Sequence, residues 1–191
     1  MGGAMTVVLR TRRFTLEEFH QMGQAGILSE DDRVELIEGE IVEMTPVGPP
    51  HAGIVARIAN VIARLLSARV IVWVQNPIQL LALASELLPD VGLLRPRDDF
   101  YTRSHPGPGD ILLLVEVMDT SVERDRRVKL PLYARAAIPE VWLVDLGAAC
   151  IEVYREPAPD GYRGVAVRRR GETLAIAAFP EVALLVDDLL G

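Results

Sequence analysis

The sequence contains one cysteine and lacks any long apolar run. With Cys150 alone among 191 residues, neither a disulfide framework nor a cysteine-based zinc site can form, and we expect Cys150 to pack as a small hydrophobic residue. No stretch approaches the roughly 20 uninterrupted apolar residues of a membrane-spanning helix. Arginines near the N-terminus have no apolar signal segment behind them. We therefore expect a cytoplasmic protein that does not cross a membrane.

Basic charge is also scarce, and lysine is almost absent. Acidic residues outnumber basic residues 27 to 20, which gives a net charge of −7 and a pI near 5.0. A nucleic-acid-binding protein usually carries a basic excess, because neutralising phosphates supplies much of its affinity. The total therefore does not favour such a partner, although a basic face can exist within an acidic total. Lys129 is the one lysine, and the other basic residues are arginines.

The composition predicts a globular domain. Half of the residues are hydrophobic and a quarter are charged. No internal repeat, low-complexity tract or long linker divides the chain, so we expect residues 1–191 to form a single domain. Composition does not predict where helices and strands lie, so we use the periodicity of the hydrophobic residues to predict them.

The periodicity predicts an ordered series of helices and strands. Thr15 and Glu18 have the spacing of a capping box, at the start of a helix that Gly23 and Gly26 would end. The most regular helix is expected over 51–66 and has an apolar stripe of Ile54, Val55, Ile58, Val61, Ile62 and Leu65. The other expected elements are a hairpin over 33–45, strands over 70–75, 78–84, 90–94, 110–118 and 140–145, a loop over 95–109, and terminal strands over 150–155, 162–168 and 173–177.

A second long helix is expected over 122–136, with Ser121 as its cap. Pro131 must mark either a kink or the first turn of a new helix, because proline lacks the N–H that a helix interior needs. The order of elements predicts an α/β (α+β) fold in which a mixed, curved β-sheet is flanked by helices.

Two carboxylates lie in apolar surroundings. Asp90 is preceded by Leu-Leu-Pro and followed by Val-Gly-Leu-Leu, and Glu116 closes a run of five aliphatic residues. An isolated charge in such surroundings is costly unless a cation, a donor or water reaches it. Each acid could instead mark the point where a strand emerges into solvent, as Asp145 does before Gly147.

The two acids together with Lys129 favour a metal site. Asp90 and Glu116 belong to two strands separated by a loop, so neighbouring strand ends could bring them together. Converging carboxylates repel unless a cation lies between them, and hard oxygen ligands select Mg²⁺ or Mn²⁺. Lys129, on the next helix, could fold back over the strand end and supply an ammonium group, which differs from guanidinium in its readiness to titrate. The alternative is a surface lysine retained by chance.

These residues belong to a larger pattern that resembles a known family. The sequence contains, in one order, VELIEGEIVEM, His51, LLPDVGLL, LLLVEVMDTSVERDRRVKLPLYARAAIPEVWLVD and IEVYRE. This set is similar to the Uma-two family of restriction-endonuclease-like proteins, a branch of the PD-(D/E)XK nuclease superfamily. The likeness extends roughly from Phe14 to Glu156, and the blocks are specific in combination and not singly.

The resemblance implies a restriction-endonuclease-like core and a set of site residues. It implies a metal held by Asp90, Glu116 and the backbone carbonyl of Val117, with Glu35 reaching the same cleft to bind a second metal or a water. The superfamily's usual lysine stands two residues after the acidic ligand, where this sequence has Met118. Lys129 from the following helix fits the lysine of Uma-two-like sequences. Because it does not lie on the strand of Glu116, the strand does not fix the position of its ammonium group.

The implied activity is Mg²⁺-dependent (or Mn²⁺-dependent) hydrolysis of DNA phosphodiester bonds, on duplex DNA and by a homodimer. Lys129 would orient or deprotonate the attacking water, and His51 would contact a phosphate or water unless it is a surface residue at a helix start. The arginines at 168–170 form the one basic cluster and would be the nucleic-acid contact outside the cleft. Two alternatives stay open: a catalytically inactive nucleic-acid-binding or regulatory module on the same scaffold, and a nuclease for RNA or for branched or single-stranded substrates.

Overall fold

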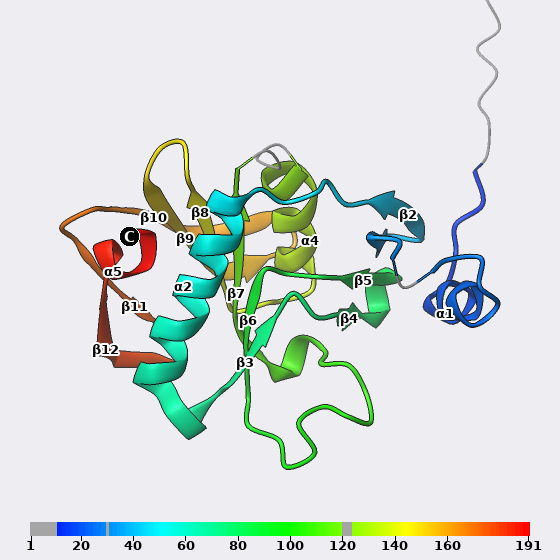
Figure 1. Cartoon of the computed structure of the whole chain (residues 1–191), viewed down its shortest axis with the longest axis horizontal. Coiled ribbons are helices and arrows are strands. Elements are labelled where there is room, and N and C mark those ends of the chain that lie inside the picture. The colour runs from blue at the N-terminus through cyan, green and yellow to red at the C-terminus, as the bar shows by residue number, and fades with distance from the viewer. Residues whose placement is uncertain (1–10, 30, 120–123) are drawn as a thin grey trace, which may run out of the picture.

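A mixed sheet forms the centre of the computed structural model, which describes residues 11–29, 31–119 and 124–191 (Figure 1). Within these residues the sheet has the strand order β10-β9-β8-β7-β6-β3. Neighbouring strands are antiparallel except β7 and β8, which are parallel. The strands are β3 (Ile71–Val74), β6 (Val91–Leu94), β7 (Ile111–Met118), β8 (Glu140–Asp145), β9 (Cys150–Ala158) and β10 (Gly161–Arg169).

A second, antiparallel sheet has the order β2-β1-β5-β4. Its strands are β1 (Val34–Ile37), β2 (Glu40–Glu43), β4 (Ile78–Leu80) and β5 (Ser85–Leu87). The expected hairpin is confirmed, and its turn residues Glu38 and Gly39 have φ of 49° and 81°, as a two-residue turn of this kind requires. A separate pair, β11 (Thr173–Ile176) and β12 (Phe179–Leu185), precedes the C-terminal helix.

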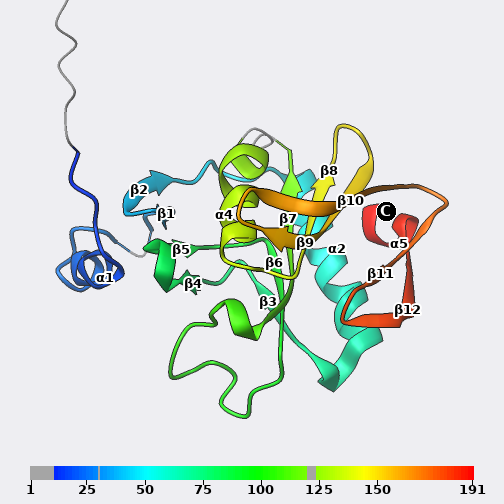
Figure 2. The same ribbon diagram turned by 180° about the vertical axis from the view of Figure 1, so that it is seen from behind.

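Helices cover both faces of the central sheet. On one face α2 (Pro49–Leu66) packs against β3, β6, β7 and the short α5 (Val186–Leu190). On the other face α4 (Leu130–Arg135) packs against β9 and β10 (Figure 2). Strand β7 is buried along its whole length, so alternate side chains supply the two apolar clusters on its two faces. The predicted mixed sheet flanked by helices is therefore confirmed.

The N-terminal helix α1 (Leu16–Gln24) lies to the side of this core (Figure 1). The predicted capping box is present: the Glu18 N–H donates to Thr15 Oγ1 at 3.2 Å and the Thr15 N–H donates to Glu18 Oε2 at 3.0 Å. Gly23 lies within the helix, so only Gly26, with φ of 71°, acts in its termination.

The long helix α2 begins two residues earlier than expected, with Pro49 and Pro50 in its first turn. Its buried face includes Val55, Ile58, Val61, Ile62 and Leu66, whereas Leu65 is 49% exposed. Leu65 was therefore wrongly assigned to the stripe. Leu65 and Leu66 are adjacent leucines, and only their different positions around the helix axis make one exposed and the other buried. The segment Pro49–Arg69 has the length and mean hydropathy, 1.2, of a membrane-spanning helix, but its packing against the sheet accounts for this apolar character.

One expected strand is wrong, and two elements near the C-terminus were not expected. The apolar run 78–84 is not one strand: β4 ends at Leu80, residues Leu81–Leu83 form a 3-10 turn, and Ala84 adopts a left-handed conformation with φ of 44°. This turn allows β5 to fold back antiparallel to β4. Near the C-terminus, β12 and the five-residue α5 were not predicted, because elements this short give no clear periodicity.

The expected helix over 122–136 is interrupted. Residues 120–123, including the expected cap Ser121, lie outside the described part of the chain. Asp125–Lys129 form a π-helical turn, and Pro131 lies in the first turn of α4. Of the two roles proposed for Pro131, the start of a new helix is the correct one.

Burial on α2 generates a matched stability test. We expect Ile62→Ala, at a fully buried position, to lower the free energy of unfolding by about 2–5 kcal/mol through lost burial and a residual cavity. Leu65→Ala, one turn away on the exposed side, should change it by less than about 1 kcal/mol. Urea unfolding followed by circular dichroism measures both, and equal losses would contradict the described helix phase.

Candidate active site

Strand register brings the two predicted carboxylates together. In the antiparallel pair β6–β7, Val91 lies opposite Val115. Continuing this register by one residue places Asp90, which precedes β6, opposite Glu116 in β7. Residues directly opposite each other in a sheet project from the same face. The expectation that neighbouring strands juxtapose these acids is met by this register, and both side chains are buried.

Three donors hold the Asp90 carboxylate. Its Oδ2 accepts a hydrogen bond from the Val117 N–H at 2.8 Å and lies 3.0 Å from His51 Nε2, while Oδ1 accepts from Gln75 Nε2 at 3.1 Å. Burial raises the pKa of Asp90, but the bonds from His51 and Val117 outweigh it and hold the pKa below its ordinary value. The same contact with Asp90 raises the pKa of His51. Asp90 is therefore a fixed, ionised carboxylate.

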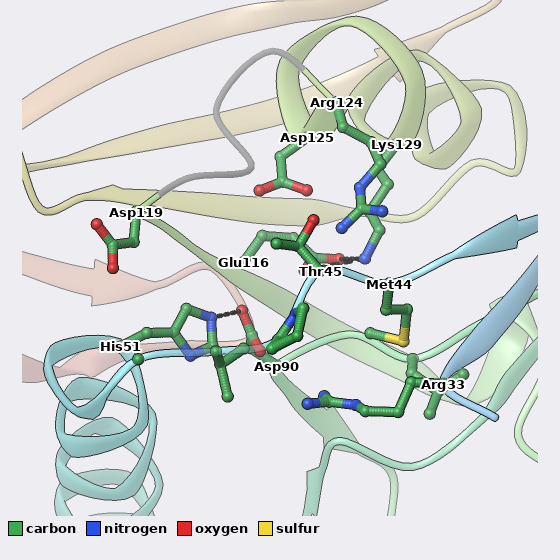
Figure 3. A pocket seen from close by; sticks show the side chains of 14 residues that line it. Arg33, Met44, Thr45, His51, Asp90, Glu116, Asp119, Arg124, Asp125 and Lys129 are labelled. Atoms are coloured by element: carbon green, nitrogen blue, oxygen red, sulfur yellow. Dashed lines mark hydrogen bonds and ion pairs between the residues drawn. The ribbon is translucent and has the colours of Figure 1, made fainter. Parts of the chain in front are cut away.

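Lys129 is buried between two further carboxylates. Its Nζ lies 3.0 Å from Glu35 Oε1 and 3.3 Å from each Glu116 oxygen (Figure 3). The Tyr133 hydroxyl donates to Glu116 Oε1 at 2.5 Å, and the Leu88 N–H donates to Glu35 Oε1 at 2.9 Å. The single lysine is thus not an exposed residue retained by chance.

The acids in this cluster outnumber its one ammonium group. The pKa of Glu116 is raised to about 8: burial raises it most, the Lys129 charge lowers it, and the neighbouring Asp125, Asp90 and Glu35 also raise it. Burial also lowers the pKa of Lys129, but the Glu116 and Glu35 carboxylates outweigh it, so the net pKa is raised. Lys129 therefore stays an ammonium ion near neutral pH, while Glu116 readily holds a proton.

These side chains open onto a pocket of about 290 Å³, which we call the Lys129 pocket. It lies between the open end of the β1–β2 hairpin, the start of α2 and the Asp125–Lys129 turn (Figure 3). Four of the predicted site residues line it, and several other polar residues join them. The lining includes His51, Asp90, Glu116 and Lys129, together with Arg33, Thr45, Asp119, Arg124 and Asp125.

Two predicted site residues do not line the pocket. Glu35 is fully buried beneath it and contacts Lys129, so it touches the site through the ammonium group. Val117 was expected to offer its carbonyl to a metal, and the contact present is from its N–H to Asp90. His51 is 6% exposed and contacts Asp90, so the expectation of a surface residue at a helix start is wrong.

Several site residues were not predicted. Tyr133 lies four residues after Lys129, one helical turn on, and this spacing could have indicated that both face Glu116. Gln75 and Arg33 gave no signal, because a polar residue at the end of a strand has no distinctive pattern. Asp125 belongs to a charge-rich segment, and such segments are usually exposed to solvent, yet the Asp125 side chain is buried.

The donor chemistry fits a hard divalent ion. In the described parts of the chain no group of three or more His, Cys, Asp or Glu side chains is placed to hold a metal. The expected ligand set, however, needs only two carboxylates and a carbonyl. Both carboxylates line one pocket, and the acids there outnumber the one ammonium group, an excess of negative charge that adds to the effect of burial in raising the pKa of Glu116. A cation would relieve that excess once the Glu116 carboxylate turned from Lys129.

Comparison with known proteins identifies the family. The Uma2 model, described as "putative restriction endonuclease", matches residues 16–187. The chain belongs to this family. Among curated proteins none matches the sequence. A crystal structure of "a putative nuclease belonging to DUF820" from Anabaena variabilis ATCC 29413 is similar, with a TM-score of 0.70, 16% identity, and coverage of 93% of this chain and 97% of that one. At this identity the likeness shows the fold, and the expected nuclease-like architecture is confirmed.

The raised pKa of Glu116 predicts a pH-dependent stability. Between pH 4.5, the ordinary pKa, and about 8, the folded protein keeps the Glu116 proton while the unfolded chain has lost it. Stability contributed by this proton therefore falls as pH rises through that window. Glu116→Gln cannot titrate, so its free energy of unfolding relative to the wild type should increase from pH 5 to pH 8. Urea titrations in EDTA measure this difference, and a constant difference would mean that Glu116 is ionised throughout.

Proposed function

We propose that this protein is a metal-dependent nuclease that hydrolyses phosphodiester bonds of DNA. One observation carries the proposal: the buried Lys129 ammonium lies against Glu116 in the same pocket as Asp90. Ionisable side chains with perturbed pKa values and specific charge partners, gathered in one pocket, are the usual mark of a functional site. Family membership supports a substrate of this class.

Asp90, Glu116 and the Val117 carbonyl are the residues that would hold Mg²⁺ or Mn²⁺. Such an ion would polarise a phosphoryl oxygen and lower the pKa of a bound water. His51, Gln75 and the Val117 N–H fix the Asp90 carboxylate before any ligand arrives. This preorganisation means that little reorientation of Asp90 accompanies binding.

Lys129 acts as a charged donor in this proposal. Because the surrounding carboxylates raise its pKa, it keeps its proton and is poorly suited to deprotonate water. Its ammonium can orient the attacking water and offset the charge that develops on the phosphoryl group. Glu35, at 3.0 Å, holds the ammonium in place from below, a different role from the second metal ligand first expected.

We further propose that the protein acts in the cytoplasm on duplex DNA as a homodimer, in which two equivalent sites would cut the two strands. An inactive module that binds nucleic acid is the main rival. The net charge of −7 and the engagement of Glu116 by Lys129 and Tyr133 favour that rival.

A cleavage assay separates these functions. We expect plasmid DNA to be cut in Mg²⁺ or Mn²⁺ and to stay intact in EDTA. Asp90→Asn, Glu116→Gln and Lys129→Met should each lower the rate at least about 100-fold, since each removes a charge from the reacting centre. Circular dichroism would show that the variants fold.

Asp145→Asn is the matched control for this assay. Asp145 also ends a buried strand, but it bonds Arg126 and the Ala148 N–H and does not line the pocket. Its variant should cut at the wild-type rate. DNA binding without metal-dependent cutting would favour the inactive module, and cutting of RNA alone would replace DNA as the substrate.

A further inference from the structure

The Lys129 pocket has a basic side as well as an acidic one. Arg33, just before β1, and Arg124, just before the Asp125–Lys129 turn, line the pocket on the side where Lys129 lies (Figure 3). Asp119 and His51 lie on the opposite side (Figure 3). An incoming phosphate group would therefore meet two guanidinium groups beside the carboxylates that favour a cation.

These two arginines keep their charge available. Ion pairs neutralise many arginines elsewhere, for example Arg69 with Glu181, Arg97 with Asp99 and Arg135 with Glu38. In the described residues, by contrast, no carboxylate lies within ion-pair distance of either pocket arginine, and Arg33 is exposed.

Backbone contacts place both arginines at the open end of the hairpin. The Arg124 Nη1 donates to the Glu43 carbonyl at 3.0 Å, which holds the guanidinium against β2 and leaves other N–H groups of its fork for a ligand. The Met44 N–H donates to the Arg33 carbonyl at 2.7 Å, which pairs the residue just before β1 with the residue just after β2. The guanidinium of Arg124 is held by this contact, the backbone of Arg33 is held beside it, and the fork of a guanidinium matches the oxygens of a phosphate.

Other anion-binding groups in the pocket are weaker candidates. The start of α2 faces it, but Pro49 and Pro50 remove two of the free N–H groups that a helix N-terminus normally offers an anion. Lys129 is buried and already paired with Glu35 and Glu116.

We propose that Arg33 and Arg124 bind backbone phosphates of a nucleic acid on either side of the bond positioned at Lys129. This inference rests on the proposed nuclease function, and it names the residues that hold the substrate. It also makes the pocket arginines, and not the arginines at 168–170, the principal contact, because Arg33 and Arg124 line the Lys129 pocket and the arginines at 168–170 do not.

Fluorescence anisotropy with a short labelled DNA duplex in EDTA tests this binding without cleavage. Arg33→Ala and Arg124→Ala should each weaken binding about 3- to 10-fold and reduce the slope of log K against log salt by about 1. Arg33→Lys should fall between the wild type and the alanine variant, because it keeps the charge and loses the fork. Arg168→Ala, an arginine on β10 outside the pocket, is the matched control and should bind as the wild type does.

The outcomes separate this inference from the nuclease proposal. Wild-type affinity and salt slope in Arg33→Ala, or a larger loss in Arg168→Ala, would overturn the phosphate contacts even if plasmid DNA is cut. Failure of the wild type to bind the duplex at low salt would overturn them as well. Binding that depends on both arginines while plasmid DNA stays intact in Mg²⁺ and Mn²⁺ would support the contacts and overturn the nuclease.

Discussion

The contact on which the site depends is that of the Lys129 ammonium with the Glu35 and Glu116 carboxylates. A buried charge is tolerated only when opposite charge and hydrogen bonds surround it, and here the partners come from β1 and β7. The contact therefore ties the hairpin sheet to the central sheet at one point. Removing the ammonium would leave two buried carboxylates facing each other, and removing either acid would leave the ammonium with one carboxylate partner in place of two. This mutual dependence explains how a single lysine in an arginine-rich chain occupies a fully enclosed position.

The sequence allowed the main elements and the central acids to be predicted, because burial leaves a pattern in a chain. Asp90 and Glu116 interrupt apolar runs, and a charge in such a run has few structural explanations. The same logic fails for exposed or short elements: Leu81 is apolar yet 71% exposed, so the run around it was wrongly extended into a strand. Glu35 and His51 were connected to the site by family likeness, whereas Lys129 was singled out as the one lysine, on the helix that follows Glu116. Gln75 joins the site through tertiary packing, which no local pattern records, whereas Tyr133 could have been found from its helical spacing to Lys129.

The acidic total charge and a nucleic-acid substrate are compatible because charge acts locally. Many arginines form ion pairs with neighbouring acids. These arginines count in the net charge of the protein but add little to the electrostatic potential at a distance. The charges that matter to a ligand are those in the pocket wall. There, Arg33 and Arg124 flank one side while the carboxylates gather on the floor. The net charge of −7 describes the surface as a whole and gives no information about this separation.

The two central carboxylates are prepared for different states by their surroundings. Asp90 accepts three hydrogen bonds, which outweigh the effect of burial and keep its pKa low. Glu116 accepts from Lys129 and Tyr133, and burial, together with the neighbouring acids, raises its pKa. Pairs of acids whose environments push their pKa values apart are characteristic of sites that move protons or bind cations. Asp90 is then the fixed charge of the pocket and Glu116 the adjustable one. In the proposed nuclease a cation would bind Glu116 only as its anion, so the cation affinity of this pocket would rise with pH as Glu116 loses its proton.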